Sequence, residues 1–214
     1  MYTSAIYITT ELFVVLMLLM SLVRFPLILK MRHLLMVLSV GYIWFISDNI
    51  SMGTIWSSFK PLNYGVLIGY CIIPSLVIGK LIIQIHRTKP GFLTDATKII
   101  NFGRLPRYAP LITYPLLSVP LQEIIFRWFY VGRLEQSNLS TAAILLISSV
   151  VFGVAHISFK NKYLLFGTTL AGIWWGALYI FTGNVLYPII SHAILGNILI
   201  WLALYKNDIQ IGKL

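Results

Sequence analysis

The chain has 214 residues, of which 58% are hydrophobic and only 10% are charged, whereas a soluble domain carries about 25% charged residues. One soluble core cannot bury so much apolar surface, so lipid must cover part of it, which excludes an ordinary water-soluble protein. The net charge is +10, but the basic residues lie between apolar runs. Anionic lipid head groups are therefore the expected partners, and nucleic acid is not.

Apolar runs long enough to cross a bilayer follow one another along the chain. A spanning helix needs about 20 mostly apolar residues, and the period-two alternation of strands is absent. From the N-terminus, the runs are Ser4–Val23, His33–Ile55, Tyr64–Ile85, Pro110–Val131, Thr141–Ser158, Tyr163–Phe181 and Val185–Tyr205. We predict an all-α fold, a polytopic membrane helix bundle of about seven transmembrane segments that forms a single domain over residues 1–214.

The connections between these runs alternate in charge. The first, third and fifth connections and the C-terminal tail are basic, while the second, fourth and sixth are nearly neutral. Because basic connections stay in the cytoplasm, the N-terminus is expected outside and the C-terminus inside. The short chain favours the cytoplasmic membrane of a prokaryote.

Ionisable side chains inside membrane helices are costly, so each one is a candidate functional group. Glu123 and Arg127 lie four residues apart on one helix face, where they can form an ion pair. His156 and His192 lie on the fifth and seventh runs, and Asn197 follows His192. Each group also has a purely structural interpretation, as a pair that holds the bundle together, a histidine bonded to a carbonyl, or a link between helices.

Taken together, these groups indicate a hydrolase. Glu123 is the only acid, and His156 and His192 are the only histidines, well inside the helices of the second half. A carboxylate and two imidazoles can activate water, with Glu123 as the base and the histidines orienting the water or binding a metal. The amide of Asn197 can donate a hydrogen bond to a developing oxyanion.

Three motifs carry a resemblance to a known family over about residues 116–199. They read Gln122-Glu123-x-x-x-Arg127, then Phe152-x-x-x-His156, then His192 with Asn197. Their order resembles that of the CAAX-protease and bacteriocin-processing family, also called Abi, which is related to the type II CAAX prenyl endopeptidases. That family shows Glu-Glu-x-x-x-Arg, Phe-x-x-x-His, and His-x-x-x-Asn or Asp.

The resemblance implies an intramembrane endopeptidase whose cavity opens inside the membrane. Its substrates would be membrane-associated, prenylated or exported peptides or proteins. It implies that a glutamate and His156 activate water and that His192 and Asn197 hold the oxyanion, with Arg127 and Phe152 in support. The resemblance leaves open whether a metal such as zinc takes part, in which case His156 and His192 would be its ligands.

Two departures from the family pattern leave an alternative open. Gln122 stands where the family usually has its catalytic glutamate, and an amide cannot accept a proton as a base. Either Glu123 supplies the base, with Gln122 in support, or the chain is a catalytically silent member. A silent member would be a bacteriocin-immunity or membrane regulatory binding protein.

The second departure concerns the last motif. Gly196 occupies the place of the family's Asn, and Asn197 lies one residue further on, about 100° away around a helix. Asn197 can serve only if the helix bulges locally. The two histidines also belong to opposite halves of the bilayer if the helices are upright. We expect tilted or broken helices that let Glu123, Arg127, His156 and His192 converge on one cavity.

Overall fold

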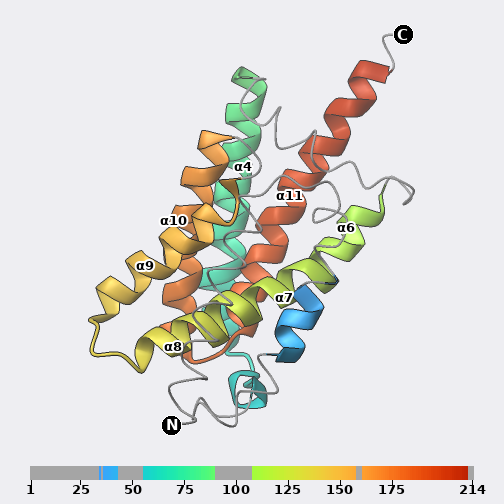
Figure 1. Cartoon of the computed structure of the whole chain (residues 1–214). Coiled ribbons are helices and arrows are strands. Elements are labelled where there is room, and N and C mark those ends of the chain that lie inside the picture. The colour runs from blue at the N-terminus through green and yellow to red at the C-terminus, as the bar shows by residue number, and fades with distance from the viewer. Residues whose placement is uncertain (1–33, 35, 43–54, 90–107, 158–160, 212–214) are drawn as a thin grey trace.

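The computed structural model describes residues 34, 36–42, 55–89, 108–157 and 161–211, and every regular element in these ranges is a helix (Figure 1). The predicted all-α class is therefore confirmed. The first predicted span, Ser4–Val23, lies outside the described residues. So does most of the second, of which residues 36–42 are helical.

Three of the described helices are long and apolar enough to cross a membrane. They cover Tyr64–Thr88, Ala109–Glu135 and Lys162–Thr182, and they coincide with the third, fourth and sixth predicted runs. Two shorter apolar helices, Thr141–Val154 and Leu186–Leu202, fall on the fifth and seventh runs. By length and composition these helices make the chain an integral membrane protein.

The span Tyr64–Thr88 consists of α3 (Tyr64–Val66), the π-helical turn η3 (Leu67–Ile72) and α4 (Ile73–Thr88), and the short 3-10 helix η2 (Ile55–Ser58) precedes it. Pro74 at the start of α4 has no N–H to donate to the carbonyl of Tyr70, four residues earlier. That carbonyl instead accepts a hydrogen bond from Trp174 Nε1 at 3.2 Å. The proline therefore opens the helix where another helix can bond to it.

The span Ala109–Glu135 alternates between α-helical and π-helical turns. It runs through α6 (Ala109–Thr113), η4 (Tyr114–Ser118), α7 (Val119–Glu123), η5 (Ile124–Val131) and α8 (Gly132–Glu135). Pro115 lies within η4, where its missing N–H and its ring disturb regular α-helical bonding. Widened π turns occur often at functional sites, and here they carry Tyr114 and Arg127 on either side of Glu123.

Small residues bring α9 (Thr141–Val154) against α10 (Lys162–Thr182). A Cβ added at Gly172 would lie 3.0 Å from the Cα of Ser149, and one at Gly153 would lie 2.0 Å from Thr169 Oγ1. Only glycine allows backbones to approach this closely, which is how helices associate in lipid without a hydrophobic driving force. This contact fixes α9, and with it the second motif, against α10.

The turn between α10 and α11 (Leu186–Ile211) is bonded to the second connection. Gly183 adopts φ 57°, and its N–H bonds to the carbonyl of Tyr179 at 2.7 Å, ending α10. The Asn184 side chain accepts from the N–H of Leu186 at 3.0 Å and donates to the carbonyl of Lys60 at 2.9 Å. The start of α11 is thereby anchored.

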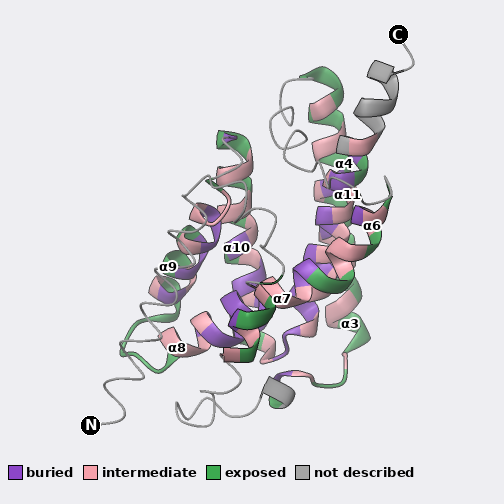
Figure 2. Cartoon of the chain, turned by 45° about the vertical axis from the view of Figure 1, so that its right-hand side comes forward, coloured by how far each residue is buried: buried purple, intermediate pink, exposed green. Residues whose placement is uncertain are grey.

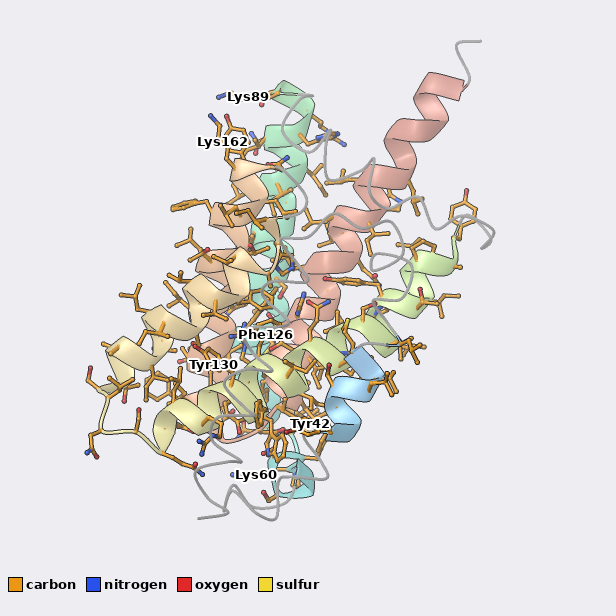
Figure 3. The ribbon with its side chains drawn as sticks, viewed as in Figure 1. Tyr42, Lys60, Lys89, Phe126, Tyr130 and Lys162 are labelled. Atoms are coloured by element: carbon orange, nitrogen blue, oxygen red, sulfur yellow. The ribbon has the colours of Figure 1, made fainter. Side chains whose placement is uncertain are left out.

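The helices do not all stand upright. α4, α10 and α11 are steep, whereas the helix from α6 to α8 crosses them obliquely and α9 slopes (Figure 1). Buried residues gather where α7, α10 and α11 come together (Figure 2). Lys89 and Lys162 lie at one end of the structure and Lys60 at the other (Figure 3). Lys89 at the start of the third connection and Lys162 at the end of the fifth therefore share an end opposite Lys60 of the second, in line with the alternation of charge.

Candidate active site

The predicted pair of Glu123 and Arg127 forms at the junction of α7 and η5. Arg127 Nε donates to Glu123 Oε2 at 2.9 Å, and both side chains are fully buried. The guanidinium carbon also lies 4.7 Å from the ring centroid of Phe152. The two terminal nitrogens of Arg127 have no hydrogen-bond partner among the described residues. The charge of each side chain is thus compensated mainly by the other.

His192 on α11 joins this pair and extends it. Its Nδ1 lies 2.6 Å from Glu123 Oε1, and its Nε2 lies 2.8 Å from the Tyr114 hydroxyl. A carboxylate only accepts hydrogen bonds, so Nδ1 carries the hydrogen, and in the neutral ring the Tyr114 hydroxyl donates to Nε2. Glu123, His192 and Tyr114 therefore form one continuous hydrogen-bonded chain.

His156 reaches the same cluster through Phe152. Its Nδ1 lies 2.8 Å from the carbonyl oxygen of Phe152. Because a carbonyl only accepts, Nδ1 carries the hydrogen, and the lone pair of the neutral ring lies on Nε2. The Phe152 ring is fully buried, with its centroid 4.9 Å from that of His156 and 5.8 Å from that of His192. Phe152 thus contacts both imidazoles.

The shape of α9 brings the two histidines together. This helix is only 14 residues long and ends at Val154, and it slopes relative to α10 and α11 (Figure 1). His156 therefore comes directly after the helix ends, and its ring packs against Phe152. The structure brings Glu123 into direct contact with both Arg127 and His192, and it places His156 next to them through Phe152.

Three further side chains support His192: Trp175 on α10, Ser75 on α4 and Ser191 on α11 itself. The Trp175 ring stacks on the imidazole, with centroids 4.0 Å apart and planes 19° apart. Its Nε1 donates to Ser191 Oγ at 2.9 Å, and that hydroxyl lies 3.0 Å from Ser75 Oγ. Sequence reasoning missed Trp175 as a site residue. The available signal was a tryptophan next to Gly176, in the segment between the second and third motifs.

Asn197 does not join His192. α11 is regular α-helix from Leu186 through position 197, so the bulge that would turn Asn197 toward His192 is not present. The Asn197 amide instead donates to the carbonyl of Leu111 at 3.2 Å. Pro115, four residues after Leu111, cannot donate to that carbonyl. In the structure, Asn197 links α11 to α6, away from the histidine that it was predicted to assist.

Gln122 and Gly196 occupy the two places where the chain departs from the family pattern. Gln122 is half-buried, and its side chain forms no hydrogen bond with the part of the chain that the structure describes. A Cβ at Gly196 would lie 2.2 Å from Tyr114 Cε1 and 2.5 Å from the Tyr114 hydroxyl. The phenol of Tyr114, which sequence reasoning also missed, therefore fills the space of the absent side chain at position 196.

The donor set does not fit a zinc ion. Among the described residues, no three His, Cys, Asp or Glu side chains are grouped so that they could hold a metal. Both oxygens of Glu123 and both ring nitrogens of His192 already have partners. A zinc ion between His156 and His192 would have to break the contact with Glu123 or with Tyr114, and it would still lack ligands.

Comparison with known proteins places these motifs in a family. Residues 105–198 match the family model described as type II CAAX prenyl endopeptidase Rce1-like. The matched region covers less than half of the chain and contains all three motifs. No curated protein and no solved structure matches the chain at a significant level. The resemblance read from the motifs is thus confirmed: residues 105–198 are similar to the Rce1-like type II CAAX prenyl endopeptidases, a family of intramembrane proteases.

Proposed function

We propose that the chain is an intramembrane endopeptidase that hydrolyses a peptide bond of a prenylated or otherwise membrane-held peptide. The observation that carries this proposal is the hydrogen bond from His156 Nδ1 to the carbonyl of Phe152. It leaves the basic lone pair on Nε2, as a general base requires. The Glu123–His192 pair lies beside it, across Phe152.

In this scheme, His156 Nε2 takes a proton from water while the water oxygen attacks the peptide carbonyl carbon. His156 then gives the proton to the leaving nitrogen as the C–N bond breaks, which yields a carboxylic acid and an amine that exchange a proton to give the carboxylate and the ammonium ion. The hydrogen-bonded chain that passes through His192 stabilises the oxyanion of the intermediate. These steps use no metal.

Glu123 takes a different part from the one that its sequence position predicts. Its two oxygens are engaged by Arg127 and His192, so it does not accept the proton of the water. It orients the His192 ring, as a buried carboxylate does for a catalytic histidine. Arg127 in turn keeps Glu123 ionised.

A second candidate is a binding protein that holds a membrane peptide without cutting it, as a bacteriocin-immunity or regulatory protein would. Gln122 favours it, because an amide stands at the position of the family's usual catalytic acid and the neighbouring carboxylate is already fully engaged. Under this candidate, restoring the acid with Gln122→Glu should create cleavage that the natural chain lacks.

The test is a cleavage assay with the purified full chain in liposomes. The probe is an internally quenched peptide that carries a farnesylated cysteine followed by three residues. The proposal predicts that the natural chain cleaves it and that His156→Gln reduces kcat by about 100-fold or more. His86→Gln, at the far end of α4, is the matched control and should retain activity. If Gln122→Glu cleaves the peptide and the natural chain does not, the natural chain is the silent binding protein.

A further inference from the structure

The contacts of His192 leave only one way in which its ring nitrogens can form a hydrogen bond toward a substrate. Nδ1 is held by Glu123 at 2.6 Å, and Nε2 is held by the Tyr114 hydroxyl at 2.8 Å. Trp175 stacks on the ring itself. A hydrogen bond that starts from Nε2 therefore passes through the Tyr114 hydroxyl, or else it requires that hydroxyl to leave.

The position of Tyr114 depends on the glycine at 196. A Cβ there would lie 2.2 Å from Cε1, 2.5 Å from the hydroxyl oxygen and 2.6 Å from Cζ of Tyr114. Any side chain at position 196 would displace the phenol, because these distances are far below van der Waals contact. The chain thus has a tyrosine on η4 and a glycine on α11 that fit each other beside His192, at the position where the family pattern has a polar side chain.

We propose that Tyr114 is the terminal hydrogen-bond donor of the Glu123–His192–Tyr114 chain and that it contacts the substrate oxyanion directly. This inference rests on the proposed function and deepens it. The phenol takes over, from a different helix, the place left empty at Gly196. Tyr114 is then a catalytic residue that the three sequence motifs do not contain.

A phenol suits this role because one hydroxyl can donate and accept at once. In the resting state, the hydroxyl donates to Nε2 of neutral His192. When the oxyanion forms, the hydroxyl hydrogen turns from Nε2 to the oxyanion, so that no proton is added to His192. Tyr114 keeps its proton throughout. A donor held in place in a site that excludes water stabilises the developing negative charge of the oxyanion.

The activity test compares Tyr114→Phe with Tyr64→Phe, a tyrosine exposed at 76%, on the farnesylated peptide in liposomes. Loss of an oxyanion donor reduces kcat by about 100-fold or more, so we expect this loss in Tyr114→Phe with KM unchanged. Gly196→Ala should show a similar loss, because its Cβ displaces the phenol. The double variant Tyr114→Ala/Gly196→Asn should recover part of the activity, because it returns a donor to position 196.

A second readout needs no turnover. The ring nitrogens of His192 are followed by NMR in the full chain labelled with 15N-histidine, with His192→Gln used to assign them. Tyr114→Phe and Gly196→Ala should both shift the Nε2 signal, while Tyr64→Phe should not. An unchanged His192 signal in Tyr114→Phe overturns the inference. A shifted signal with turnover that survives Tyr114→Phe overturns the donor role alone. If the signal shifts but neither the natural chain nor any variant cleaves the peptide, both the donor role of Tyr114 and the proposed function are overturned.

Discussion

Removing the charge of Arg127 should be among the most destabilising single changes in the second half of the chain. Arg127→Met keeps a long apolar side chain but deletes the guanidinium whose Nε lies 2.9 Å from Glu123 Oε2. Both side chains are fully buried, so water cannot replace the lost partner. Breaking a buried ion pair on one side costs about 3–5 kcal/mol, a large share of the roughly 5–15 kcal/mol that a domain has in total.

The double variant Glu123→Gln/Arg127→Met measures the energy of the ion pair separately from the effects of changing each side chain. It removes both charges at once, so it should lose at least about 1 kcal/mol less than the two single variants together. Unfolding in detergent is followed by tryptophan fluorescence, with Arg87→Met on the exposed end of α4 as the control, expected within about 0.5 kcal/mol of the parent. The buried pair would be refuted if Arg127→Met lost less than about 1 kcal/mol of unfolding free energy, or if the losses of the two single variants added up to that of the double variant.

Three further predictions follow from the packing and the charges. Gly172→Val should destabilise the chain by about 1–3 kcal/mol in the same unfolding assay, because even a Cβ there lies 3.0 Å from a backbone atom of α9. Gly183→Ala should cost about 1–2 kcal/mol, because this residue has φ 57°. Cysteines at Lys60 and Lys162 should react with an impermeant maleimide from opposite sides of sealed vesicles, with little background from buried Cys71; labelling of both from one side would contradict the predicted topology.

The helices and the ion pair could be predicted because each depends on a local rule. The thickness of the bilayer sets the length of an apolar run, so Tyr64–Thr88 and Lys162–Thr182 fall where hydropathy places them. The spacing of four residues puts Glu123 and Arg127 on one helix face, and they pair there. Neither inference needs any knowledge of how the helices pack.

Tyr114 could not be predicted, because its role arises from packing between helices. It lies 78 residues from His192, on a π-helical turn next to Pro115. In the sequence, Tyr114 is one of many tyrosines and lies in an apolar run. Gly196 stands out only because it lacks the polar side chain that the third motif has at this position. Their complementarity becomes visible when η4 lies against α11. Helix periodicity describes one helix at a time and says nothing about that contact.

The sequence did not indicate which groups Asn197 and Glu123 would bind. Asn197 was expected near the oxyanion, but the carbonyl of Leu111 is within its reach, and a regular α11 keeps it there. Glu123 was expected to be the base, but Arg127 and His192 engage both of its oxygens. A motif gives the residue type at a position, whereas the hydrogen-bond partners depend on the neighbouring helices.

The central claim is that this chain hydrolyses a membrane-held peptide with water activated at His156. Its most direct test is mass spectrometry of the farnesylated peptide after incubation with the full chain in 18O-labelled water. We predict a shortened prenylated product with a single heavy oxygen in its new carboxylate, formed by the natural chain and not by His156→Gln. If the natural chain leaves the peptide intact, or if His156→Gln forms the same labelled product at the same rate, the account is contradicted.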